Sequence, residues 1–203
     1  MKQILIATSY FPPAAYLSAC MKAEVIFVEA FETYTKQTCR NHCRIYGPGG
    51  IQTLTVPVRK PNGNHTLTKD IRISSEIHWQ RTHWRAITAA YNKSPFLLYY
   101  QDHLEKFFTR RYDFLLDLNM EILGQIFEIL KSEIVIKVTR EYEKSPDLVV
   151  DLRNELVSKH ASDKGFPEYT QPFSNKFGFK GNLSCLDLLF NLGPEAGAYL
   201  SGT

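Results

Sequence analysis

The sequence predicts an α/β protein with a mainly parallel sheet that begins with a β-α-β unit and is followed by a helical C-terminal part. Two short apolar runs, Gln3–Thr8 and Glu24–Ala30, are rich in aliphatic and β-branched residues, as is typical of buried strands. The segment between them, Ala14–Lys22, has a helical composition, and Pro13 is suited to its first turn. Two strands joined by a helix pair in parallel through a right-handed crossover, so these segments predict the start of a parallel sheet.

Further strands and helices are predicted along the rest of the chain. The helical portions cover approximately residues 79–131 and 183–192, and no regular element is predicted for the polar segment 31–46. With 203 residues, of which 44% are hydrophobic, the chain has enough apolar material for one core, so we expect a single domain over residues 1–203. The predicted strands are Ile51–Val58, Asp70–Ser74, Ile134–Val138 and Leu148–Leu152, and the predicted helices are Trp79–Tyr91, Gln101–Phe108, a long helix from an N-cap at Asp113 to Lys131, and Leu183–Leu192.

Charge and composition limit the classes of function. The formal net charge is +3, the isoelectric point is about 8.6 and no dense basic stripe occurs, so we expect attraction for anions but no nucleic-acid binding. No apolar run approaches the roughly 18 residues of a membrane span, and the short run at the N-terminus is not typical of a secretory signal. The four cysteines lack paired spacing and are expected to be reduced thiols, which favours a cytoplasmic protein.

The predicted topology brings two polar segments to one edge of the sheet. Ligands of parallel α/β sheets bind at the carboxyl ends of the strands, often against the N-terminus of the next helix. We therefore expect a pocket lined jointly by residues 10–16 and 29–44, with the helix that starts at Ala14 aimed at it and Trp79–Tyr91 opposite. Alternatively, the tyrosines pack in the core and the charged groups are solvated. The side chains expected in this pocket are Tyr10, Tyr16, Glu29, Glu32, Tyr34 and Lys36.

Three cations follow the second strand and suggest an anionic ligand. Lys36, Arg40 and Arg44 lie within nine residues of one another, and arginine binds phosphate or carboxylate with two parallel hydrogen bonds. Asn41 lies among them and can orient a polar group. The alternative is an ordinary exposed basic face. The sequence thus predicts a small-molecule anionic ligand, whose contacts would be Lys36, Arg40, Asn41 and Arg44 together with Tyr10, Tyr16 and Tyr34.

Candidate catalytic groups are Glu29, Glu32 and His83. The two carboxylates are three residues apart and could act as acid and base or hold a divalent cation, unless they are simply exposed. His83 could carry a proton, although a structural role is the alternative. Cys39, His42 and Cys43 supply too few ligands for a closed zinc site, so we expect no metal. The common nucleotide-cofactor motifs are absent, and the sequence leaves the identity of any cofactor unknown.

An ordered set of short motifs runs along nearly the whole chain. They are Tyr10-Phe11-Pro12-Pro13 with Tyr16, Glu29 to Lys36, Asn41 to Ile45, Leu54 to Val58, the spacing of Trp79, His83, Trp84, Ile87, Tyr91, Ser94-Pro95 and Tyr99, and Asn182-Leu183 with Asp187 to Pro194. Together these motifs resemble the WbqC-like family. The resemblance implies a link to the biosynthesis of O-antigen, the outer part of bacterial lipopolysaccharide, or of another surface polysaccharide. Two departures concern the candidate site: Glu29 and Glu32 stand where many relatives carry adjacent aspartates, and His42 and Cys43 replace an arginine and an asparagine.

The strand–loop–helix–strand opening is also similar in layout to nucleotidylyltransferases and pantothenate synthetase. Those enzymes place a His-x-Gly-His motif on the first helix, whereas Tyr16 stands near the position of a histidine here and the glycine is missing. Two functional hypotheses follow. The first is a transferase-type enzyme that acts on an anionic activated small molecule such as a nucleotide-sugar. The second is a non-catalytic binding or scaffold protein of the same pathway. The sequence does not distinguish between these two hypotheses, and it does not indicate the oligomeric state.

Overall fold

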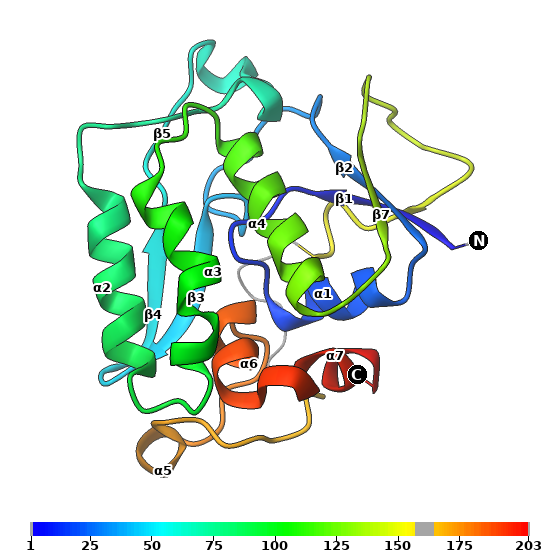
Figure 1. The fold of residues 1–203 in the computed structure, drawn as a ribbon. Helices are drawn as coiled ribbons and strands as arrows, with labels where there is room; N and C mark the ends of the chain where they lie inside the picture. Colours follow the sequence, from blue (N-terminus) through cyan, green and yellow to red (C-terminus); the bar gives the residue numbers. More distant parts are fainter. Residues whose placement is uncertain (1, 157–164, 203) are drawn as a thin grey trace.

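A four-stranded parallel sheet forms one side of the molecule (Figure 1). The computed structural model describes residues 2–156 and 165–202. The strand order is β7-β2-β1-β8, and all three pairings are parallel, with Ile4 opposite Ile26 in the first pair. The predicted β-α-β opening and mainly parallel sheet are therefore confirmed. The strands are β1 (Gln3–Ala7), β2 (Val25–Glu29), β7 (Val135–Val138) and β8 (Val150–Asp151).

Helix α1 (Ala14–Met21) connects β1 to β2 and carries no charged residue. Its side chains are buried or half-buried throughout, with Tyr16, Leu17 and Cys20 in the core. The C-terminal helices α6 (Cys185–Leu192) and α7 (Ala196–Gly202) pack against it (Figure 1). A helix that is apolar on all sides is stable only when other elements cover it, which explains why the C-terminal helices dock here.

A hairpin outside the main sheet carries the segment that follows β2. Strand β3 (His42–Gly47) pairs antiparallel with β4 (Gly50–Thr55), and α2 (Trp79–Tyr91) packs on β3. No strand was predicted within residues 31–46, because this segment is dominated by polar residues. Its inward-facing residues, Cys43 and Ile45, nevertheless alternate with half-buried polar ones, which is the period of a strand.

Helix α4 (Leu115–Ile129) begins one residue later than predicted, with Phe114 and not Asp113 at its N-cap position. Asp113 is not its N-cap: the backbone carbonyl of Asp113 accepts a hydrogen bond from Ile73 (2.9 Å). The N–H group of Leu115 donates to Ile71 (3.0 Å), so the chain is still extended against β6 at this point. Tertiary pairing thus overrides a favourable capping residue. The pair β5 (Val58–Arg59) and β6 (Arg72–Ile73) is antiparallel.

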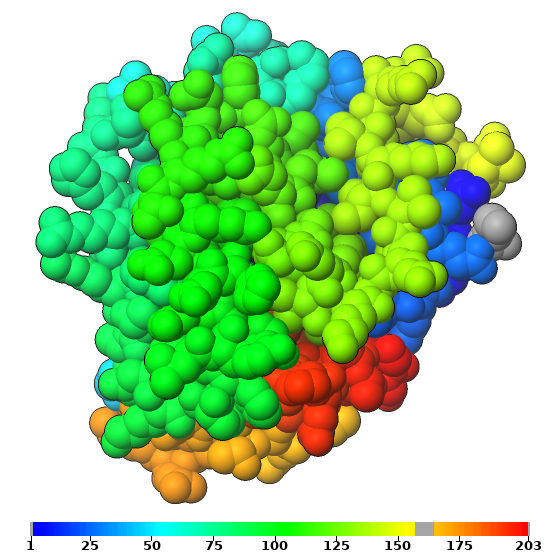
Figure 2. Space-filling view, viewed as in Figure 1, coloured from blue at the N-terminus to red at the C-terminus, as the bar shows by residue number. Residues whose placement is uncertain are grey.

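The remaining helices complete a continuous outer layer. Helix α3 (Leu97–Thr109) packs on α2 and α4, and in Figure 2 α3, α4 and the C-terminal helices form most of the visible face. One cluster of buried side chains extends from Ile4 to Leu200 and joins the sheet to the helices. The short elements are η1 (Gly63–His65), η2 (Thr68–Asp70), α5 (Ser174–Phe177) and η3 (Gly193–Glu195).

Gly193 is expected to be intolerant of any side chain. Its φ is +57°, and a Cβ atom there would lie 2.6 Å from Cγ of Phe96. We predict that Gly193→Ala lowers the free energy of unfolding by on the order of 3 kcal/mol, from strain and overpacking together. Gly124→Ala is the matched control, because a Cβ in the middle of α4 meets nothing within 4 Å; it should stabilise by about 0.5–1 kcal/mol. Urea denaturation measures both, and equal stability of the two variants would contradict this account.

Candidate functional site

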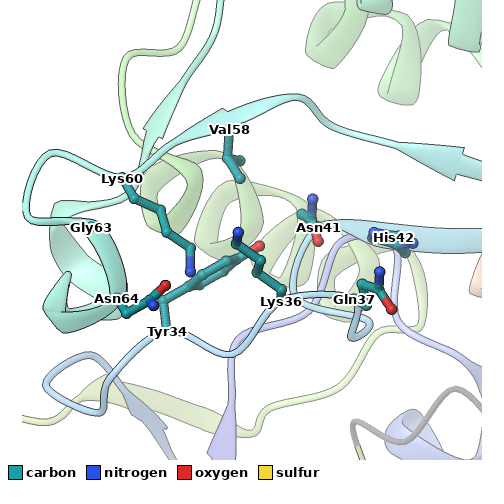
Figure 3. Close-up of a pocket in the computed structure, with 9 residues that line it drawn as sticks. All are labelled: Tyr34, Lys36, Gln37, Asn41, His42, Val58, Lys60, Gly63 and Asn64. Carbon is teal, nitrogen blue, oxygen red and sulfur yellow. The ribbon is translucent and has the colours of Figure 1, made fainter.

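A pocket of about 520 Å³ lies between the segment after β2 and the turn after β5 (Figure 3). Its volume is within the range of small-molecule sites. Amide, imidazole, phenol and ammonium groups line it, and none of its nine lining residues is acidic. The lining residues are Tyr34, Lys36, Gln37, Asn41, His42, Val58, Lys60, Gly63 and Asn64.

Tyr34 forms the floor of this pocket. The N–H group of Tyr34 donates to the carbonyl of Thr66 (3.0 Å), which ties the two sides of the pocket together. The side chain is 4% exposed, and its hydroxyl group is buried without a hydrogen-bond partner in the protein. Burial raises the pKa of Tyr34 to about 12, so the hydroxyl remains protonated at neutral pH. The group can therefore donate a hydrogen bond to a bound anion.

Two lysine ammonium groups extend into the same space above Tyr34 (Figure 3). Nζ of Lys60 lies 5.5 Å from the centre of the Tyr34 ring. Burial lowers the pKa of Lys60, and the positive charge of Lys36 lowers it further. The two cations therefore repel each other in the free protein, and an anion between them would relieve that repulsion.

Asn41 supplies a fixed hydrogen-bond acceptor at the inner end of the pocket. Its Nδ2 donates to the carbonyl of Val56 (2.9 Å), and its own carbonyl accepts from the Val56 N–H group (2.9 Å). The other side-chain atom, Oδ1, is buried and has no hydrogen-bond partner in the protein. A ligand hydroxyl or N–H group could satisfy it.

Three of the predicted ligand contacts, Tyr34, Lys36 and Asn41, thus lie together in one pocket. Lys60 and Asn64 were not predicted. The topology of a parallel sheet points to the carboxyl ends of its strands, whereas these two residues belong to the turn around β5 and η1. The available signal was the turn sequence Pro61-Asn62-Gly63-Asn64 directly after a lysine.

Arg40 and Glu32 form a buried ion pair beside the pocket. Arg40 is 1% exposed, and its Nε and Nη2 lie 2.8 and 2.7 Å from Oε1 of Glu32. Its Nη1 donates to Oγ1 of Thr38 (3.2 Å). Burial raises the pKa of Glu32, although the charge of Arg40 opposes this shift. Arg40 could bind a ligand anion, as predicted, only if its ion pair with Glu32 opened. The same opening would be needed for Glu32 to act as a base.

The carboxyl edge of the sheet is occupied by a second ion network. Glu29, the last residue of β2, is fully buried, and its Oε2 accepts from Nη1 of Arg153 (2.9 Å). Its Oε1 accepts from the Phe31 N–H group (2.8 Å) and from Oγ1 of Thr139 (2.9 Å). Arg153 also binds Asp151 through Nε and Nη2, and these hydrogen bonds lower the pKa of Asp151. A protein guanidinium group therefore lies where the topology predicted a ligand.

Tyr10, Tyr16 and His83 are core residues. The hydroxyl of Tyr16 donates to the carbonyl of Ala7 (2.8 Å), and the hydroxyl of Tyr10 lies 2.9 Å from Nδ1 of His83. His83 also has a hydrogen bond with the backbone of Thr55. Nδ1 of the ring therefore has a partner within the core, and burial lowers the pKa of His83 to about 4. A proton-transfer role for His83 stays a prediction and would require one of these hydrogen bonds to break.

The N-terminus of α1 was expected to point at the pocket, but its first backbone N–H groups are bonded to another part of the protein. The N–H groups of Ala14 and Ala15 donate to the carbonyl of Leu183 (3.0 Å) and to Oδ1 of Asn182 (2.9 Å). These two donors are therefore satisfied within the protein, and the Tyr10–Tyr16 segment is not among the walls of the pocket. Arg44, on β3, is half-buried and donates through Nη2 to the carbonyl of Asn182 (3.0 Å), and it is not among the residues that line the pocket.

Two negative findings apply to residues 2–156 and 165–202. No group of three or more histidine, cysteine, aspartate or glutamate residues in these ranges is arranged to hold a metal ion. No helix there is long and apolar enough to cross a membrane.

The pairing of Glu29 with Arg153 predicts a large loss of stability when only the cation is removed. Arg153→Met should lower the free energy of unfolding by about 3–5 kcal/mol, because an unpaired carboxylate would remain buried. Adding Glu29→Gln should restore a large part of this loss, and Arg140→Met, at an exposed arginine, should have little effect. Urea unfolding followed by circular dichroism measures all four proteins. A double variant no more stable than Arg153→Met would contradict the explanation.

The lowered pKa of His83 predicts a contribution to acid denaturation. The folded pKa of about 4 lies below the ordinary value of 6.5, so the neutral ring is favoured by folding. This contribution is complete above pH 6.5 and is lost as the pH falls to 4, to an extent on the order of 3 kcal/mol. We predict that His83→Gln flattens the dependence of unfolding free energy on pH in this window, whereas His103→Gln, on the exposed side of α3, leaves it unchanged. Identical slopes for wild type and His83→Gln would refute the prediction.

Comparison with known proteins identifies the family of the chain. It is similar to the uncharacterised protein Rv1507c of Mycobacterium tuberculosis, with 26% identity in an alignment 230 residues long that covers 98% of each protein. No solved structure matches it. The sequence profile of the WbqC-like protein family matches residues 8–163, which include the segment 34–64 that builds the pocket. The chain therefore belongs to the WbqC-like protein family, as its motifs predicted.

Proposed function

We propose that this protein binds an anionic small molecule in the pocket of Figure 3, with a phosphoryl or carboxylate group between Lys36 and Lys60. The observation that carries the proposal is the convergence of two ammonium groups in a pocket that no acidic residue lines. Lysine pairs on an open surface are solvated and separate, whereas here Lys60 lies over the buried ring of Tyr34 and Lys36 lines the same pocket. The cost of keeping them together is offset when an anion binds.

The other polar groups restrict the kind of ligand. The Tyr34 hydroxyl is a donor suited to the anion, and Oδ1 of Asn41 is an acceptor that needs a hydroxyl or N–H partner. A molecule with a phosphoryl group and sugar hydroxyls meets both demands. A nucleotide-sugar is such a molecule, which fits the role in O-antigen or surface-polysaccharide biosynthesis that the family resemblance implies.

The reaction we propose is transfer of a group from such an activated donor. Glu32 is the nearest candidate base in the chain, two residues before Tyr34, and its raised pKa suits a proton acceptor that Arg40 holds in place. Glu29 and His83 remain candidates of the same kind, although both are engaged in the core. A nucleotidylyltransferase-like layout is compatible with the parallel strand order and is part of this proposal. The alternative is a protein that binds the same ligand without changing it.

Removal of the two lysines tests the binding site. We predict that Lys36→Ala and Lys60→Ala each weaken binding of glucose 1-phosphate or UDP-glucose by about tenfold, because each deletes a charge-assisted contact. The double variant should lose binding, and higher salt should weaken it in the wild type. Thermal shift and calorimetry measure the affinity. The control is Lys93→Ala, an exposed lysine outside the pocket.

Three results decide between the proposals. If neither these compounds nor inorganic phosphate or acetate binds at millimolar concentration, or if the double lysine variant binds as well as the wild type, the pocket is not an anion site. If UDP-glucose binds and phosphorus NMR detects release of UDP that Glu32→Gln abolishes, the enzyme hypothesis is supported. Binding without turnover of any nucleotide-sugar tested, in the presence of sugar acceptors, would favour the non-catalytic alternative.

A further inference from the structure

Strand β7 ends the parallel sheet with an open edge. Among the described residues it pairs only with β2, and no other strand lies on its outer side. The N–H groups of Val135 and Thr139 donate to Glu24 (3.1 Å) and Val28 (3.0 Å), so the odd-numbered backbone groups face β2. The backbone groups of Ile136 and Val138 therefore point outward. Figure 2 shows this segment, in yellow-green, on the visible surface.

This edge lacks most of the features that prevent pairing with another chain. Protected edge strands carry prolines, bulges or several charges. Within β7 there is no proline, and Val135 and Val138 are 49% and 40% exposed. The single charged residue is Lys137. A lysine on an edge strand usually opposes pairing with another chain, but its effect depends on the charge of the side chain opposite it in the interface.

We propose that two copies of the chain pair through this edge, antiparallel and centred on Val135. In this register Glu133 of each copy lies opposite Lys137 of the other, so the interface carries two opposite-charge pairs. Ile134 of each copy then lies opposite Ile136 of the other. Both residues have outward-facing backbone groups, so these groups can hydrogen-bond across the interface. A register centred on Ile136 also matches the backbone, but it sets Val135 against Lys137 and leaves both charges unmatched. Charge complementarity therefore selects the first register.

The side chains suit this arrangement on both faces of the extended sheet. Lys137 lies over the ring of Phe27, with its Nζ 5.8 Å from the ring centre, so Val135 and Lys137 share the face that carries Phe27. On this face the two Val135 side chains would meet at the two-fold axis, between the two charge pairs. On the other face Ile134 and Ile136 are half-buried against the core, and their counterparts would continue that apolar layer. Such an isologous contact closes as a dimer.

Exchange of the two charges gives a direct test. Sedimentation or light scattering at roughly 10–100 μM, where even a weak interface is populated, should give the wild type twice the 23.4 kDa mass of one chain. Lys137→Glu and Glu133→Lys should each be monomeric, because each sets like charges opposite one another. An equimolar mixture of the two variants should dimerise, since every pair is then of opposite charge, and the double variant should dimerise with itself. Lys93→Glu changes the net charge equally at a distant exposed site and should remain dimeric.

A monomeric wild type at the highest concentration would overturn the proposal. A dimer that survives both single exchanges would overturn it as well, because another surface would then be responsible. Circular dichroism must show that each variant is folded. If the variants are folded and monomeric but their mixture does not dimerise, the proposed register is wrong.

Discussion

The buried carboxylate of Glu29 is the interaction on which the arrangement of the main sheet depends. Its two oxygens contact the chain after β2, the chain after β7 and the arginine that follows β8. Three of the four strands are thereby joined at one point, at the edge where their backbone ladders end. A buried carboxylate is tolerated only with a cation and full hydrogen bonding, and Arg153 with Thr139 and Phe31 provides both. β8 has two residues, so side-chain contacts of this kind matter more for its position than its short ladder does.

This network also explains why the polar pocket is not at the usual place for the fold. In open parallel sheets the crevice at the carboxyl edge is normally left for the ligand. Here Arg153 and Glu29 fill that edge with each other, and the Leu183 carbonyl and Asn182 side chain cover the first N–H groups of α1. Two of the buried polar atoms without a hydrogen-bond partner in the protein lie farther along the chain, on Tyr34 and Asn41 in the wall of the pocket. The chain from the end of β2 onward thus has two roles. Glu29 stabilises the sheet, and the residues from Tyr34 to Asn41 line the candidate site.

The sequence predicted the sheet better than the site. The apolar pattern of a strand or helix is local in the sequence, whereas the side-chain contacts that form the site join residues far apart in the chain. The runs around Ile4 and Ile26 and the helix Trp79–Tyr91 are unambiguous patterns, and the structure contains them within one or two residues. β3 was missed because its charged residues hide a two-residue alternation. For the site, crowding of cations after β2 pointed to Lys36, but no pattern distinguishes it from Arg40, which is 1% exposed and neutralised by Glu32. Lys60 comes from a turn that only tertiary contacts bring to Tyr34.

The same contacts determine how well the pocket is prepared for a ligand. The segment from residue 29 to 41 is fixed at its start by the Glu29 network and at its end by the two hydrogen bonds between Asn41 and Val56. Between these points, the Arg40–Glu32 pair and the bond from Tyr34 to Thr66 hold the chain against the turn that carries Lys60. Little backbone order then remains to be gained on binding, so little entropy is lost. For the proposed ligand, the mutual repulsion of the Lys36 and Lys60 side chains is a cost already present in the free protein. An anion that removes this repulsion gains affinity without reorganising the fold.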